Sequence, residues 1–183
     1  MNHQGTKTLE TERLVLRRFR YSDAESMFRN WASDPKVTEF LMWQPHETVE
    51  ASKQILAGWL NHYVRPDYYV WAIELKEPGE PVGCISVNEI DESVGSVRIG
   101  YCLGPRWWHQ GIMTEAFQAV IRFLFEEVGV NRIEARHDPN NPHSGGVMKK
   151  SGLIYEGTLR KSMKSNQGIT DACVYGILRE DHD

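Results

Sequence analysis

The stretch Gly104-Pro105-Arg106-Trp107-Trp108-His109-Gln110-Gly111-Ile112-Met113-Thr114-Glu115-Ala116 decides the fold of this chain. It lies between an apolar run that ends at Leu103 and an amphipathic run over residues 112–128. The first run predicts a strand and the second predicts a helix, so Gly111 stands at a strand-to-helix turn. The helix would be strongly one-sided, because its apolar residues share one face: Phe117, Val120, Ile121, Leu124 and Val128.

The turn at Gly111 has the chemistry of an anion-binding site. The first turn of a helix has four backbone N–H groups without helical partners and carries the positive end of the helix dipole. A phosphate fits there when the backbone can be approached closely, and a glycine allows that approach. Taken alone, however, one glycine favours a plain turn without a ligand.

Residue patterns on both sides of this turn predict one α/β domain. Helices are expected over residues 22–33, 46–63, 112–128 and 141–151, with a short one starting at Asp34-Pro35. Ser22 and Glu25 form a capping-box pattern for the first helix. Strands are expected over residues 14–20, 69–73, 82–87, 96–103, 132–137, 154–162 and 170–178. This order predicts a mixed, largely antiparallel sheet with a strand–helix–strand crossover in the middle.

The composition favours a cytoplasmic globular protein. Of the 183 residues, 40% are hydrophobic and 25% are charged, with a formal net charge of −4. Lys and Arg are scattered, which disfavours nucleic-acid binding, and no apolar run is long enough to span a membrane. The N-terminal residues lack the apolar core of a signal peptide. The three widely spaced cysteines, Cys84, Cys102 and Cys173, are predicted to be reduced thiols.

Four segments carry motifs in the same order as one enzyme family. Trp108–Ala116 is similar to W-G-K-G-(aromatic or Ile)-(Ala or Met)-T-E-A, and Ile99–Leu103 is similar to I-G-Y-x-L. Asn141–Leu153 is similar to N-x-x-S-x-x-V-x-x-x-x-G-F, and Leu9–Arg17 to L-x-T-E-R-L-x-L-R. Over residues 9–178 the chain therefore resembles the GCN5-related N-acetyltransferases (GNAT), in particular the branch that acetylates N-termini of ribosomal proteins.

The resemblance implies one GNAT domain over residues 9–180, with short tails at 1–8 and 181–183, and acetyl-coenzyme A as cosubstrate. In the family the pantetheine arm of the coenzyme lies between two splayed strands, where main-chain groups of Cys102 and Leu103 would hold it. Asn141 and Ser144 would face the coenzyme from the following helix. Backbone amides of the turn would bind the pyrophosphate, and they belong to Trp108, His109, Gln110, Gly111, Ile112, Met113 and Thr114.

Four positions depart from the pattern of the family. His109 and Met113 stand where glycine and a small residue are commoner. A protonated His109 would add a cation near the phosphates, although an exposed side chain is slightly favoured. Arg98 and Met163 stand where some members have glutamates, one of which is proposed as the general base. These last two departures leave the general base open.

Candidates for proton transfer follow from the same resemblance. Ser144 matches the proposed acid of the branch and would donate a hydrogen bond to the leaving sulfur, with a capping or surface hydroxyl as its alternative. Glu89 is the candidate base because of its expected strand position, with Glu39 and His137 as alternatives. The family transfers the acetyl group directly, so no covalent acyl-enzyme through Cys102 is expected.

The chemistry favours an α-amine as the acceptor. At pH 7 about a tenth of α-amino groups are neutral, against about 0.04% of lysine amines, so the missing glutamates matter less for an α-amine. We therefore expect acetylation of a protein N-terminus, of the ribosomal-protein type. The alternatives are a small amine, such as a polyamine, amino acid or antibiotic, and a non-catalytic acyl-coenzyme A sensor.

Two further expectations concern metals and assembly. No metal site is predicted, since Pro139 and Pro142 place His137, Asp138 and His143 in a structured loop. A homodimer or a higher assembly would be unsurprising for this branch, although no residue pattern shows one.

Overall fold

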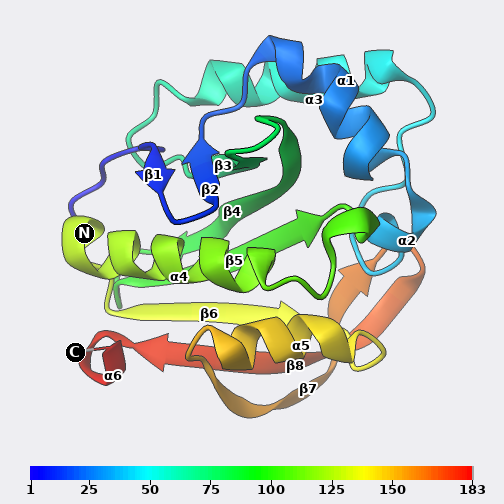
Figure 1. Cartoon of the computed structure of the whole chain (residues 1–183). Coiled ribbons are helices and arrows are strands. Elements are labelled where there is room, and N and C mark those ends of the chain that lie inside the picture. The colour runs from blue at the N-terminus through cyan, green and yellow to red at the C-terminus, as the bar shows by residue number, and fades with distance from the viewer. Residues whose placement is uncertain (183) are drawn as a thin grey trace.

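An eight-stranded sheet runs through the computed structural model, which describes residues 1–182 (Figure 1). Its strands lie in the order β1-β2-β3-β4-β5-β6-β8-β7. All neighbours are antiparallel except β5 and β6, which are joined by a helical crossover. The predicted largely antiparallel α/β fold is confirmed. The bounds of the strands are β1 Leu9–Glu10, β2 Leu14–Arg17, β3 Val70–Leu75, β4 Pro81–Asp91, β5 Ser96–Leu103, β6 Arg132–His137, β7 Ile154–Ser165 and β8 Gly168–Leu178.

Helices cover both faces of this sheet, and each face has its own apolar core. α1 (Ala24–Met27) and α3 (Val49–His62) pack with one cluster, which includes Leu56 and Cys84. α4 (Ile112–Phe123) and α5 (Pro142–Lys150) pack with the other. Successive strand residues enter opposite clusters, as the side-chain alternation of a strand requires. Two short helices complete the chain: α2 (Pro35–Thr38), and α6 (Arg179–His182) after β8.

The amphipathic run after Gly111 forms the helix that the pattern predicts. α4 continues into a π-helical turn, Leu124–Val128, so helical backbone spans residues 112–128. All five residues of the predicted apolar face are buried in the core. The Gly111 turn is therefore anchored on one side by β5 and on the other by a fully packed helix.

The segment 22–33 differs from the single helix predicted for it. A 3₁₀ turn (Tyr21–Asp23) leads into α1, and a π-helical turn (Phe28–Ala32) follows. The predicted capping role of Ser22 and Glu25 is wrong. Asp23 does the capping instead, because its carboxylate accepts a hydrogen bond of 2.7 Å from the amide of Arg20.

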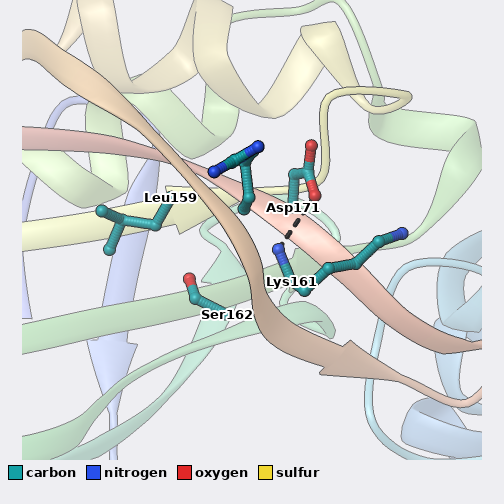
Figure 2. A pocket seen from close by; sticks show the side chains of 5 residues that line it. Leu159, Lys161, Ser162 and Asp171 are labelled. Carbon is teal, nitrogen blue, oxygen red and sulfur yellow. Dashed lines mark hydrogen bonds between the residues drawn. The ribbon is translucent and has the colours of Figure 1, made fainter.

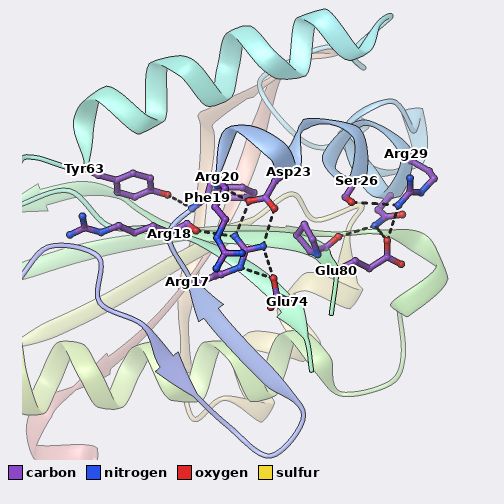
Figure 3. A network of polar contacts seen from close by, with 12 residues as sticks. Arg17, Arg18, Phe19, Arg20, Asp23, Ser26, Arg29, Tyr63, Glu74 and Glu80 are labelled. Atoms are coloured by element: carbon purple, nitrogen blue, oxygen red, sulfur yellow. Dashed lines mark hydrogen bonds and ion pairs between the residues drawn. The ribbon is translucent and has the colours of Figure 1, made fainter. Parts of the chain in front are cut away.

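Asp23 also neutralises the charge of a buried arginine, Arg17 (Figure 3). Arg17 is only 6% exposed and donates to both carboxylate oxygens of Asp23, at 2.8 and 2.9 Å, and to Glu74 at 2.6 Å. Burial alone would lower the pKa of Arg17, but its hydrogen bonds to Asp23 and Glu74 outweigh burial and raise it. A buried charge needs such partners, so this network ties the 3₁₀ turn before α1 to β2 and β3.

Other boundaries shift by a few residues. β2 ends at Arg17, three residues earlier than predicted, and α3 begins at Val49 after a Thr48 cap. β7 and β8 are longer than predicted, and neither β1 nor α6 was predicted. The Asp34 cap of α2 is confirmed by a hydrogen bond from the amide of Lys36.

The sequence predicts short tails at residues 1–8 and 181–183, on either side of a domain at 9–180. Residues 1–8 lie against the sheet: Thr6 is buried, and the Trp71 indole donates to the Lys7 carbonyl at 2.7 Å. The segment 181–183 begins within α6, and its last residue lies outside the described residues. Among residues 1–182, no helix is long and apolar enough to cross a membrane.

Candidate active site

A cavity of about 990 Å³ opens where β5 and β6 separate. The two strands pair only as far as Ile99 and Ala135. Beyond that point β5 stays paired with β4 up to Leu103, while Arg136 and His137 pair only with β8. The gap between the strands is lined on both faces of the sheet, by residues from the segments 36–42, 88–89, 98–103, 107–114, 136–150 and 162–164.

The two faces divide this cavity into two halves. Leu103 belongs to the core under α4 and Tyr101 packs against it, whereas Cys102 packs against the core under α3. The α4 half is the part lined by Tyr101, Leu103 and residues of the segments 107–114 and 141–148. The α2 half is the part lined by Glu89, Arg98, Arg136 and residues of the segments 36–42 and 162–164.

The Gly111 turn forms one wall of the α4 half. Gly111 is the N-cap of α4 and has a φ of +75°, in the left-handed region that glycine adopts without strain. His109, two residues earlier, has a φ of +60°. Gly111 and the next three residues line the cavity, so the N-terminus of a twelve-residue helix lies at its wall. This helix N-terminus at the cavity wall is where the sequence predicts an anion site.

The end of β5 presents its backbone to the gap. The amide of Gly104 donates to the carbonyl of Val82 in β4. Because the direction of hydrogen bonding alternates along an antiparallel pair, the amide of Leu103 points away from β4 and toward the gap, while that of Cys102 points toward β4. The Leu103 carbonyl accepts a hydrogen bond of 2.8 Å from the Trp108 indole. Of the two predicted residues, Leu103 therefore faces the gap with its main chain.

The cavity gathers ten of the predicted coenzyme residues and leaves one outside. Gln110 does not line it, and its side chain turns back to donate to the Arg106 carbonyl at 2.9 Å. His109 is exposed and its ring meets that of His143 edge-on, with centroids 4.9 Å apart. Trp108 is 37% exposed. The turn therefore contributes both backbone amides and aromatic side chains to the rim of the cavity.

Ser144 is paired with a tyrosine that sequence reasoning did not assign a role. The Ser144 hydroxyl donates to the Tyr101 hydroxyl at 3.1 Å, which in turn donates to the Ser144 carbonyl at 2.9 Å. Burial raises the pKa of Tyr101, so its hydroxyl stays protonated. Tyr101 lies within the I-G-Y-x-L motif, which was the available signal.

Asn141 is the N-cap residue of α5 and is followed by a proline at the start of the helix, but its side chain makes no capping hydrogen bond. It sits at the N-cap position, where only its backbone is engaged, with its amide donating to the Asp138 carbonyl at 2.8 Å. The Asn141 side chain instead lines the α4 half. Its amide group is therefore available to a ligand there.

His137 is a buried residue beneath α5 rather than an open ligand. Its Nδ1 donates to the Asp138 carbonyl at 2.8 Å, and its ring packs 5.6 Å from that of Tyr175. Within residues 1–182, no three histidine, cysteine, aspartate or glutamate side chains gather as a metal site would need.

An ion-pair network forms the floor of the α2 half. Glu89 and Arg98 are register partners across β4 and β5, and their side chains form a close ion pair. Arg98 also contacts Glu134 at 3.1 Å, and Arg136 contacts Glu134 at 2.7 Å. Burial alone would raise the pKa of Glu134, but hydrogen bonds from the arginines lower it. The Glu89 side chain stays 63% exposed and lines the cavity.

Two segments far apart in sequence make the walls of the α2 half. The Asn166 side chain donates to the carbonyls of Thr38 and Trp43, at 2.9 and 2.8 Å, and its amide donates to that of Leu41. This side chain therefore links the α2 segment to the β7–β8 hairpin, whose turn lies beside α2 in Figure 1. Glu39 and Met163 line the cavity from these two walls.

A smaller hollow lies on the β7–β8 hairpin (Figure 2). Here residues 160–162 of β7 stand opposite Asp171 alone, between the register pairs of Leu159 and Met163. Lys161 has a φ of +50°, and its amide donates to the Asp171 carboxylate at 2.9 Å. Asp171 thus fastens the irregular stretch from which Met163 enters the cavity.

The thiols of Cys84 and Cys102 are poor nucleophiles. Burial raises the pKa of Cys102, which lines the cavity, to about 12. Burial also raises the pKa of its register partner Cys84 well above the usual range. Both side chains therefore stay protonated near neutral pH, which disfavours a covalent acyl-enzyme.

Comparison with known proteins identifies the family. The model of the acetyltransferase (GNAT) domain matches residues 13–154. This chain belongs to the GNAT family. It is 31% identical over 176 residues to the uncharacterized N-acetyltransferase p20 of Bacillus licheniformis, covering 96% of this chain and 98% of p20. This GNAT chain is therefore an acetyl-coenzyme A-dependent N-acetyltransferase, as the motifs predict.

Further relatives place the chain near the ribosomal branch. It is 27% identical over 157 residues to the ribosomal protein uS5-alanine N-acetyltransferase of Escherichia coli, covering 81% of this chain and 79% of the relative. The crystal structure of a GNAT acetyltransferase from Bacillus anthracis superposes with a TM-score of 0.84 and 26% identity, over 95% of this chain and 99% of that one.

Proposed function

We propose that the α4 half binds acetyl-coenzyme A and that the α2 half receives the α-amino group of a protein N-terminus. The observation that carries this proposal is the gap between β5 and β6, which joins the two halves beside the amide of Leu103. A donor held on one face of the sheet and an acceptor held on the other would meet there. The cytoplasm, where thiols such as Cys84, Cys102 and Cys173 stay reduced, is the proposed location.

The residues of the α4 half fit the chemistry of the coenzyme, which supplies the acetyl group and a thiolate leaving group. Amides from Trp108 to Thr114 would hold the pyrophosphate, and the Asn141 side chain would face the pantetheine arm. The amide of Leu103 would stabilise negative charge on the acetyl oxygen. A fixed backbone donor of this kind is a major source of catalysis in acyl transfer.

Proton transfer is assigned to one residue on each face. Ser144 would turn its hydroxyl from Tyr101 to the departing sulfur, while the Tyr101 hydroxyl keeps its hydrogen bond to the Ser144 carbonyl. Glu89 would accept a proton from the amine, directly or through one water, with Arg98 fixing its carboxylate. Since Cys102 stays protonated, the amine would attack the thioester directly.

The charged side chains that line the α2 half indicate which class of acceptor would fit it. Cationic and acidic side chains both line it: Lys36, Arg98, Arg136 and Lys164 against Glu39 and Glu89. Such a lining disfavours polycations, so polyamines and aminoglycosides are poor candidates. A protein N-terminus fits better, and the uS5-alanine N-acetyltransferase relative acts on a ribosomal protein. An amino acid is the second candidate, because Lys36 and Lys164 would also suit its carboxylate.

A turnover assay tests this proposal. Purified protein and acetyl-coenzyme A are mixed with N-terminal peptides, free amino acids, polyamines and aminoglycosides, and thiol release is followed. We expect turnover with peptides and the weakest turnover with polycations. Preference for a polycation would overturn the acceptor assignment. Tight coenzyme binding without turnover of any acceptor in the panel would favour an acyl-coenzyme A sensor.

A further inference from the structure

Four hydrogen bonds fasten the Gly111 turn to the β1–β2 hairpin. Arg13 donates from Nε to Glu115 Oε2 at 2.7 Å and from its backbone amide to Glu115 Oε1 at 2.9 Å. Thr11 donates from its hydroxyl to the same Oε1 at 2.6 Å. Arg13 Nη1 donates to the carbonyl of Gln110 at 2.9 Å. We call this set of contacts the hairpin clamp.

The clamp holds a stretch of backbone that would not keep its shape alone. His109 and Gly111 both have positive φ, and for His109 that conformation is strained. Gln110 lies between them, and its carbonyl is the atom that Arg13 holds. Arg13 Nη2 also lies 3.5 Å from the point where a Cβ at Gly111 would stand. One arginine side chain therefore braces the whole bend.

The hairpin clamp also pairs the negative charge of Glu115 in the first turn of α4. Glu115 lies in that turn, where an unpaired carboxylate would repel a bound pyrophosphate. Burial alone would raise the pKa of Glu115, but hydrogen bonds from Thr11 and Arg13 lower it, so the carboxylate stays ionised and paired. Arg13 compensates this charge while contacting the turn that would bind phosphate.

We propose that Arg13 is a positioning residue for the coenzyme, which keeps the Gly111 turn in its anion-binding shape through Gln110 and Glu115. This inference rests on the proposed function of the α4 half. Without the clamp, the turn would sample other conformations. If about one molecule in ten kept the competent shape, the apparent dissociation constant for acetyl-coenzyme A would rise about tenfold.

The test uses two acetyl donors that differ in the pyrophosphate. Arg13→Met keeps much of the side-chain length and removes two of the four clamp donors, Nε to Glu115 and Nη1 to Gln110. We expect its KM for acetyl-coenzyme A, and the dissociation constant measured by calorimetry, to rise about tenfold with kcat at saturation little changed. The kcat/KM for S-acetylpantetheine, which lacks the pyrophosphate, should stay within about twofold of wild type. The control is Glu10→Gln on the same hairpin, since Glu10 contacts Lys76 and not the turn.

Each outcome decides the inference. Unchanged affinity of folded Arg13→Met for acetyl-coenzyme A would overturn it, and so would an equal loss with both donors, which indicates general damage. If Arg13→Met does not fold, Thr11→Val takes its place and should show a smaller shift with acetyl-coenzyme A alone. Failure of the wild-type protein to bind acetyl-coenzyme A would instead overturn the proposed function, and this inference with it.

Discussion

The two halves of the cavity are built in different ways. The α4 half consists of backbone amides at one strand-to-helix junction, together with the start of α5. The α2 half consists of side chains from β4, β5 and β6 and from two walls that Asn166 links. Backbone donors tolerate changes in neighbouring side chains, whereas a side-chain site depends on each residue present. We therefore expect the donor specificity to be general to the family and the acceptor specificity to be particular to this chain.

The largest effect should come from the backbone of the α4 half. In Gly111→Val a β-branched residue must adopt a φ of +75°, which costs about 2 kcal/mol or more, or the turn must change shape. We expect the dissociation constant for acetyl-coenzyme A, measured by calorimetry, to rise by at least about thirtyfold.

A glycine at the other end of the same helical segment provides the control. Gly129 has a φ of +77°, and nothing lies within 4 Å of the point where its Cβ would stand. Gly129→Val should therefore lower the melting temperature while leaving coenzyme affinity near wild type. If folded Gly111→Val binds the coenzyme normally, the pyrophosphate assignment is wrong.

A smaller effect is expected at the hydroxyl pair of the α4 half. Ser144→Ala removes the donor proposed for the sulfur, so kcat should fall about tenfold while the dissociation constant for acetyl-coenzyme A stays the same. Tyr101→Phe keeps Ser144 and removes its partner, so a loss of about threefold is expected. Steady-state kinetics with calorimetry distinguish the two parameters. An unchanged kcat in Ser144→Ala would remove it as the acid.

An effect smaller than that of Ser144→Ala should come from Glu89, and it should depend on pH. With an α-amine acceptor of pKa about 7.7–8.0, a base matters below that range and much less above it. Glu89→Gln should lower kcat/KM about fivefold at pH 7 and approach wild type by about pH 9. A pH–rate profile on an N-terminal peptide measures this. A deficit that stays constant up to pH 9 would show that Glu89 serves binding rather than proton transfer.

Helices and strands were predictable where a single hydrophobic periodicity runs through the whole segment. Residues 112–128 and 132–137 match their predicted ranges because every apolar residue of those patterns is buried. The segment 22–33 was mispredicted because its cap is decided by Arg17, which is buried beside the distant Glu74 and recruits Asp23. Local sequence carries no sign of that tertiary contact.

The candidate site also divides into a part that local sequence predicts and a part that depends on tertiary contacts. The Gly111 turn was predictable because its residues are consecutive and its ligand would bind main-chain amides. The walls of the α2 half were not, since the contacts of Asn166 with Thr38 and Trp43 span more than a hundred residues. The hairpin clamp was hidden for the same reason, although Thr11, Arg13 and Glu115 all stand in motifs that the sequence displays.

Hydrogen exchange measured by mass spectrometry tests the two-sided site most directly. Acetyl-coenzyme A alone should slow exchange in peptides that cover residues 103–114 and 141–150 and leave residues 36–43 and 160–168 unchanged. An acceptor peptide added with coenzyme A should then protect residues 36–43 and 160–168. Protection of residues 36–43 and 160–168 by acetyl-coenzyme A, with none at 103–114, would contradict the assignment of the two halves.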